Sequence, residues 1–365
     1  MGRVRVNVLG KTCQPVIDRA AMRIFFTLPI TLLALAASQS SSFAAAPRPK
    51  FVDVVTIGQQ AGFQAGLPNS GSFDAVLNQN TLDGGVTTGQ GDGPGDQVIR
   101  TSSGEERWTA FTGFNFNSLD VEGFTGIQLR TSSYNAGVLY RLTPNIRIGA
   151  SIGGVHSRGD IASGGNTSSD GLALGAYAVG NWGDNFIDLL YSATLLSNDI
   201  TRTPLGTNAS GSADSETHAI SATFGRNMRF GRWVTGPRIG LDYAHWSMDS
   251  YTETGPGAVA FGQQSANSLV ARADWFTSYD IKTSSGTVTP YAIAGWHRET
   301  MSGNPNNAGP GFIAGTDRVR HYMVAGTGLT WSLPCGGKLN AGYTGQFFGG
   351  AYQVHNISAM LAWSF

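Results

Sequence analysis

The sequence predicts an all-β protein, a twelve-stranded antiparallel transmembrane β-barrel of the outer membrane, preceded by a short flexible N-terminal segment. Three observations predict this class. Apolar and polar residues alternate from Trp108 onward, short and long connections alternate between the segments, and the chain ends on Phe365 at the edge of an apolar strand face. Terminal residues of soluble domains are usually polar and frayed, so this ending indicates a strand that faces lipid.

The first element, residues 1–44, has the features of a cleaved secretory signal peptide. A single Arg follows Met22, an apolar run covers 24–37, and small residues continue to Ala44. Met22 is an alternative start of the chain. These 44 residues hold five basic side chains and one acidic, so the remainder has 19 basic and 23 acidic residues. Such a balance leaves no basic patch, and we expect no nucleic-acid partner.

The second element, residues 45–106, is predicted to be a short flexible segment. It is rich in Gly, Gln, Asp, Asn and Thr, a composition typical of linkers. No repeat of solenoid length occurs in it. The best helical candidate is 72–82, which is poor in helix formers.

The third element, residues 107–365, is predicted to be the barrel. The alternation is regular in "SYNAGVLYRL" (133–142), "IRIGASIGG" (146–154), "GLALGAYAVGNW" (171–182) and "KLNAGYTGQFF" (338–348). Helical spacing does not produce a period of two, so these segments are strands. The segments "VTPYAIAGW" and "MVAGTGLTW" alternate less cleanly, and their two faces stay unassigned.

The connections between these strands follow a rule. Short turns are expected at 142–145, 182–185, 229–233, 282–286 and 333–337, with a short final link at 348–352. Longer polar stretches are expected at 118–132, 158–170, 198–216, 247–266 and 301–317. Tight turns at one end and longer loops at the other, with an even number of strands, are typical of outer-membrane barrels.

Composition agrees with a membrane barrel. Charged residues are 13% of the chain, against roughly 25% in soluble domains. The body of the chain has no apolar run of the ~18 residues that a transmembrane helix needs. In hydrocarbon an open sheet leaves backbone groups unpaired, so strands must close into a barrel. The alternative is a soluble periplasmic β-sandwich, which would carry more surface charge and no rule of connection length.

Charged residues of the strands lie on the face opposite the apolar one and are expected to line the lumen. These candidates are Arg141, Arg147, Asp188, Arg226, Arg238, Asp242, Arg272 and Asp274. An Arg at the lipid midplane would cost about 2–4 kcal/mol, which excludes the reverse arrangement. Five tryptophans near strand ends are expected to form an interfacial girdle, namely Trp108, Trp182, Trp233, Trp331 and Trp363.

Residues 107–365 resemble the translocator domain of autotransporters (type V secretion). The resemblance rests on "ERWTAFTGFNF", "YNAGVLYRLTPNIRIGASIGG", "VTPYAIAGWHRE" and the ending "ISAMLAWSF". It implies twelve strands and a lumen that a preceding segment threads. It also implies that Leu361, Trp363 and Phe365 belong to a signal read by the barrel-assembly machinery. Family members usually carry a long passenger, whereas this chain offers only the 62 positions 45–106.

The leading functional hypothesis is therefore a barrel that translocates or displays a short N-terminal segment at the cell surface. The alternatives are a stand-alone outer-membrane pore without cargo and an outer-membrane hydrolase. The local groups "DSETH" (214–218) and "WHRE" (296–299) lie at or near expected loops, where polar residues are ordinary, so no enzyme is expected. No metal site is predicted, since no spacing matches a zinc site. No catalytic residue and no cofactor are predicted either. The expected partners are outer-membrane lipid and the assembly machinery, around a monomeric barrel.

Overall fold

The computed structural model describes residues 7–8, 11–12, 107–121, 127–161, 165–203, 207–302, 321–334, 336–347 and 352–365. Two short strands, β1 (Asn7–Val8) and β2 (Lys11–Thr12), pair with each other. Otherwise the predicted signal peptide, the flexible segment 45–106 and the helical candidate 72–82 lie outside the described residues.

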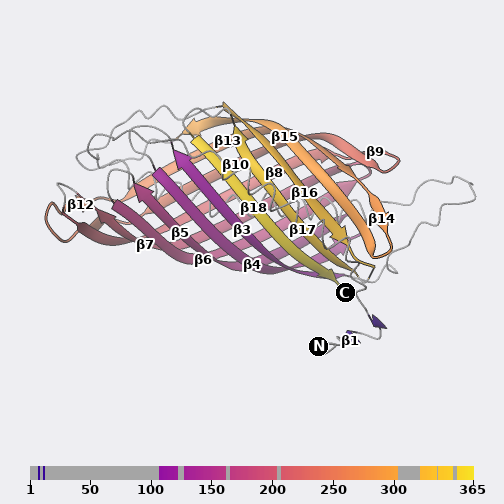
Figure 1. Ribbon diagram of the computed structural model, residues 1–365, viewed down its shortest axis with the longest axis horizontal. Helices are drawn as coiled ribbons and strands as arrows, with labels where there is room; N and C mark the ends of the chain where they lie inside the picture. The colour runs from indigo at the N-terminus through magenta and orange to yellow at the C-terminus, as the bar shows by residue number, and fades with distance from the viewer. Residues whose placement is uncertain are drawn as a thin grey trace, which may run out of the picture.

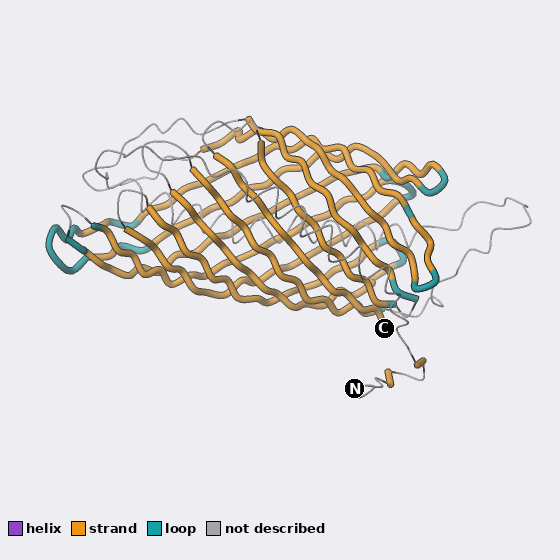
Figure 2. Tube along the Cα trace, viewed as in Figure 1, coloured by secondary structure: helices purple, strands orange, loops and turns teal. Residues whose placement is uncertain are grey.

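Twelve long antiparallel strands form a closed barrel (Figures 1 and 2). They are β3 (Trp108–Val121), β4 (Ile127–Thr143), β5 (Ile146–Ile161), β6 (Gly165–Trp182), β7 (Asn185–Arg202), β8 (Ala209–Arg226), β10 (Trp233–Met248), β13 (Gln264–Tyr279), β15 (Gly286–Ser302), β16 (His321–Ser332), β17 (Gly337–Phe347) and β18 (Tyr352–Ser364). Each pairs with its sequence neighbours, and β18 pairs with β3 to close the ring. The predicted fold class is confirmed.

Four shorter strands complete the described structure. β9 (Met228–Phe230) and β14 (Ile281–Thr283) pair with the starts of β10 and β15 and lengthen two turns. β11 (Tyr251–Thr252) and β12 (Ala260–Phe261) pair with each other between β10 and β13. No helix among the described residues is long and apolar enough to cross a membrane.

The alternating residues of each strand point to the inside and the outside of the barrel in turn. Along β7, Leu189, Tyr191 and Leu195 are exposed, whereas the intervening Asp188, Ser192 and Thr194 are buried. Successive side chains of a strand point to opposite faces, and in a closed barrel the buried set points inward. The outer surface is therefore apolar over much of its height, as a surface in contact with lipid must be.

Turns gather at the barrel end where the C-terminus lies, beside β9 and β14 (Figure 1). Two of them place a glycine in the left-handed region, Gly183 (φ 62°) and Gly231 (φ 63°), which favours residues without a Cβ. Aromatic pairs lie at this end: Trp108 contacts Tyr140 and Trp233 contacts Tyr279, with the rings tilted against each other and their centroids 4.7 Å and 4.8 Å apart.

The loops at the opposite end are shorter than the sequence predicts, and three expected long connections are wrong in extent. Described strands extend into the stretches 118–132, 158–170 and 198–216: β3 runs to Val121 and β4 starts at Ile127, β5 runs to Ile161 and β6 starts at Gly165, and β7 runs to Arg202 and β8 starts at Ala209. The physical reason is that strands continue beyond the lipid, where both faces are polar and the alternation that marks a strand disappears. The barrel is thus taller than its apolar band.

Candidate functional site

The interior of the barrel is the candidate functional site, and most of the predicted lumen residues point into it. Seven lie on the inward face of their strands: Arg141, Arg147, Asp188, Arg238, Asp242, Arg272 and Asp274. Arg226 does not, and its prediction as a lumen residue is wrong. It shares the outward face of β8 with Ile220 and Phe224, and its side chain is 56% exposed, 3.7 Å from Asp184 in the turn. At this end of the strand the arginine lies beyond the apolar band, so an outward position is not costly.

One wall of the lumen, formed by β8, β10 and β13, carries an ion pair. Arg272 Nε lies 2.8 Å from Asp242 Oδ2, and both side chains are only 12% exposed. The guanidinium also donates to Ser221 and Thr223, at 3.2 Å and 2.8 Å. Ser221 in turn donates to Asp242 at 2.6 Å. The carboxylate, the guanidinium and two hydroxyls of three strands thereby form one network.

A second inward pair lies next to it on β13 and β15. Asp274 Oδ1 is 2.9 Å from His297 Nε2, and both side chains are largely buried. Gly295 faces Asp274 in the register, and a Cβ there would meet the carboxylate oxygen at 1.7 Å, so only glycine leaves room for this contact. The sequence predicts His297 at or near a loop, whereas it lies within β15. Tyr291 and Ile293, which precede His297 at a spacing of two, lie on the same inward face of β15. The alternation in this segment is too weak for the sequence alone to assign that face.

Arg238 occupies the same wall in a different way. Its guanidinium lies 3.9 Å from the centroid of the Phe276 ring and 5.5 Å from that of Phe186. Cation–π contacts of this kind are favourable where water is scarce. The side chain is 6% exposed.

The opposite wall is polar but mostly neutral. Many of its inward residues are amides and hydroxyls, namely Asn115, Asn117, Thr131, Ser133, Thr330, Asn340, Asn356 and Ser358. Toward the turn end the same wall also carries apolar inward residues, Phe111, Leu139, Met360 and Ala362, which belong to one buried cluster. They bond across strands, as in Asn356 to Asn117 at 2.6 Å and Asn340 to Thr330 at 2.8 Å. The lumen is therefore asymmetric, with the inward ion pairs on one wall and mostly amides, hydroxyls and a buried apolar cluster on the other.

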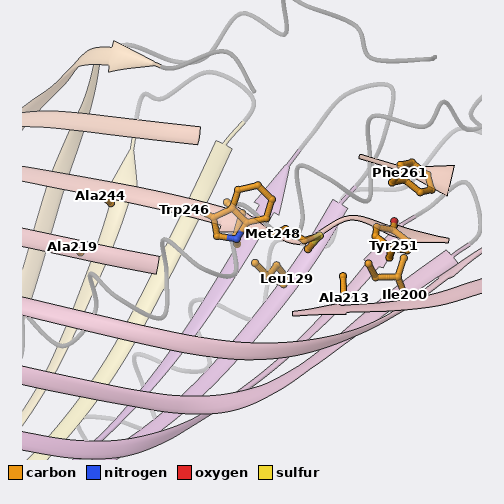
Figure 3. Packing of buried hydrophobic residues seen from close by; sticks show 10 residues of the cluster. Leu129, Ile200, Ala213, Ala219, Ala244, Trp246, Met248, Tyr251 and Phe261 are labelled. Carbon is orange, nitrogen blue, oxygen red and sulfur yellow. The ribbon is translucent and has the colours of Figure 1, made fainter. Parts of the chain in front are cut away.

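The loop end of the lumen is narrowed by apolar side chains. Leu119 of β3, Leu129 of β4, and Trp246 and Met248 of β10 belong to one buried cluster, against which Val354 of β18 packs. β3 and β10 lie on opposite sides of the barrel, since five strands separate them in either direction around the ring. In Figure 3, Leu129 lies beside Trp246 and Met248. We call these five residues the apolar constriction.

A hairpin from the loop between β10 and β13 packs at the rim above this constriction. Arg202 of β7 donates to the carboxylate of Glu253 with both Nε and Nη2, and both side chains are buried. Tyr251 and Phe261 stack with ring centroids 4.8 Å apart, and they belong to the same apolar cluster. Burial, followed by the Glu253 charge, raises the pKa of Tyr251 above its ordinary value.

The C-terminal strand closes the barrel. Backbone bonds join Trp108 and Phe365 in both directions, at 3.2 Å and 2.9 Å. Leu361 and Phe365 point outward and are exposed, and Trp363 shares their face. The three residues implied as an assembly signal thus lie in one outward row beside the barrel seam.

The sequence motifs that could suggest catalysis lie within barrel strands. Asp214 and His218 lie within β8, and the pattern G-x-S-x-G, present at 149–153, lies within β5. There Ser151 bonds to Tyr177 at 2.7 Å, whereas a nucleophile elbow requires a strand-to-helix turn. Within the described part of the chain no group of three or more His, Cys, Asp or Glu could hold a metal ion.

Comparison with known proteins gives three findings. A family model described as autotransporter beta-domain matches residues 107–344. The translocator domain of the autotransporter NalP from Neisseria meningitidis is similar in structure, with a TM-score of 0.62 and 18% identity over 81% of this chain and 98% of that one. The β domain of the Bordetella autotransporter BrkA gives a TM-score of 0.59 and 15% identity over 71% of this chain and all of that one. At such identities the likeness establishes the fold alone. No curated protein matches the sequence significantly.

Proposed function

Because the chain belongs to the autotransporter β-domain family, we propose that its barrel translocates or displays the N-terminal segment 45–106 at the cell surface. Autotransporter β-domains are outer-membrane secretion domains, and we propose no catalytic activity for this one. Residues 1–44 would direct export and be removed, leaving a mature chain that begins after Ala44.

The observation that carries the proposal is the place where the barrel begins. Trp108 lies at the turn end, bonded to Phe365, so the residues before it are joined to the periplasmic side. To reach the surface from there, a segment must pass through the lumen. The charged and amide walls suit a Gly-, Asn- and Asp-rich chain, whose backbone needs hydrogen-bond partners throughout its passage.

The apolar constriction supports a gated passage. A lumen that is narrowed by apolar side chains resists the passage of ions and water, because such constrictions lose water readily. In this proposal the constriction closes behind or around the translocated segment. The outward row Leu361, Trp363 and Phe365 would be recognised earlier, by the barrel-assembly machinery, before a monomeric barrel inserts.

A second candidate is a stand-alone outer-membrane pore whose N-terminal segment stays in the periplasm or lumen. The short extent of that segment, 62 positions, favours it. An epitope tag after Lys50, with an external protease added to intact cells, separates the two. Loss of the tag with the barrel intact supports translocation, whereas protection until the outer membrane is breached supports the pore.

Two control tags calibrate the protease experiment. A tag inserted at 204–206, between β7 and β8, should be cleaved in intact cells because it belongs to the loop end. A tag at the turn 183–184, between β6 and β7, should stay protected. If both controls behave and the Lys50 tag resists cleavage, the translocation proposal is wrong.

A further inference from the structure

Two arginines face each other on the outer surface of the barrel. Arg130 of β4 and Arg158 of β5 are direct partners in the register, and both are exposed. Side chains in such positions have Cβ atoms about 5 Å apart, and like charges placed there repel. Serines flank the pair on either side, Ser118 opposite Arg130 and Ser168 opposite Arg158.

Acidic residues lie near this pair on the same outward face, but none of the described ones forms an ion pair with it. Asp170, the closest acid on β6, is bonded to His156 at 2.6 Å. Asp160 shares the outward face of β5 and lies opposite Gln128 and Asn166. The two adjacent exposed guanidiniums are therefore accessible to an anion from outside the chain.

The position of the two arginines along the barrel axis indicates that such an anion would belong to a membrane lipid. On β4 the outward apolar run ends at Tyr134, and Arg130 is the second polar outward residue after it. On β5 the run ends with Ile152 and Gly154, and Arg158 is again the second polar one. Both lie toward the loop end, so they lie at the headgroups of the outer leaflet, within reach of flexible arginine side chains.

We propose that Arg130 and Arg158 form a site for a phosphate group of a phosphorylated glycolipid in the outer leaflet. Guanidinium groups bind phosphate oxygens in bidentate fashion. One phosphate between the two arginines neutralises their repulsion, and Ser118 and Ser168 are placed to donate further hydrogen bonds. The site fixes the height and rotation of this barrel face in the membrane, independently of any transported segment.

The test uses the purified full-length chain in detergent with diphosphoryl lipid A as the probe, measured by native mass spectrometry. We expect the wild type to bind this lipid about tenfold more tightly than its dephosphorylated form, and the Arg130→Gln/Arg158→Gln variant to lose that preference. The matched control Arg226→Gln/Arg298→Gln removes the same charge from two exposed outward arginines that do not face another arginine. It should keep the preference within about twofold.

Four results would overturn the proposal. They are equal binding of the dephosphorylated lipid, equal loss in the control variant, displacement by equimolar inorganic phosphate, and a dimer that the Arg130 and Arg158 changes abolish. The third result would make the site one for free phosphate, and the fourth one for a second copy. Since both side chains are exposed, folding should persist, and Arg158→Gln alone serves if the double variant folds poorly.

Discussion

Charged side chains inside the barrel are positioned by strand register. Arg272 reaches Asp242 although the two are not direct partners, because Gly240 lies opposite Arg272 and leaves the space that its guanidinium occupies. The added Cβ of an alanine at 240 would lie 2.8 Å from Arg272 Nη2. A small residue on one strand thus determines which acid a long side chain on the next strand finds.

Breaking this pair should destabilise the barrel. Asp242→Asn leaves Arg272 without its carboxylate, and we expect the free energy of unfolding to fall by about 3 kcal/mol. Arg272→Gln should cost a similar amount. Urea unfolding of each variant and of the double variant, followed by tryptophan fluorescence in vesicles, measures the coupling. The double variant should lose less than the sum of the single losses, and strict additivity would contradict the network.

Tyr251 at the rim gives a pH-dependent prediction outside the membrane. Its pKa is raised above the ordinary value of 10.0, mainly by burial, so folding favours the neutral phenol. Its stabilising contribution is complete below pH about 10 and is lost as pH rises toward the folded value. The absorbance titration of wild type minus Tyr251→Phe should show one phenol ionising later than free tyrosine. Ionisation at the ordinary value would contradict a buried hydroxyl.

At the scale of elements, the outward face of a single strand defines the membrane band. Leu189 and Ser197 lie on the same face of β7, eight residues apart, so they are about 26 Å apart along the strand. Leu189→Arg should cost about 2–4 kcal/mol and Ser197→Arg about 0–1 kcal/mol, because only the first lies within the hydrocarbon. Folding titrations in lipid vesicles compare the two. Equal costs would mean that the band is placed wrongly.

The C-terminal strand should be the element that controls assembly. Phe365→Ala and Trp363→Ala are expected to reduce the amount of folded barrel in the outer membrane severalfold, because they remove the outward row beside the seam. Trp233→Ala is the control, since Trp233 is equally exposed at the same end but lies on β10. Heat-modifiable migration of the membrane fraction measures the yield. A matching loss in the control would assign the effect to the girdle instead.

Strands could be predicted from the sequence wherever one face meets lipid. Alternation placed Val138, Ile148 and Leu174 outward, and the structure agrees. It could not place strand ends beyond the lipid, because residues such as Ser168 and Ser169 are polar on both faces. The predicted lumen position of Arg226 is wrong for a related reason. This residue lies at the strand end beyond the apolar band, where a charge on the outward face is tolerated.

At the scale of the whole molecule, contacts across the lumen cannot be predicted from the sequence. Leu119 and Trp246 are separated by 126 positions and five strands, and no local pattern connects them. Leu119 follows the polar inward residues Asn115 and Asn117, whereas Trp246 lies between Ala244 and Met248 on the inward face of its strand, so the two residues share no common pattern in the sequence. Closure of the ring brings them together at one level, so the constriction is a property of the barrel and of no single strand.

Removing the constriction should open the loop end. Leu129→Ala with Trp246→Ala deletes the largest apolar groups that meet from opposite walls, and we expect higher single-channel conductance and greater sensitivity of cells to large antibiotics. The control Phe111→Ala with Leu139→Ala removes apolar volume from a cluster in which these two residues lie on adjoining strands. It should destabilise the barrel without raising conductance. If both variants conduct alike, the closure lies elsewhere, and gating of the translocated segment must be sought in the loops.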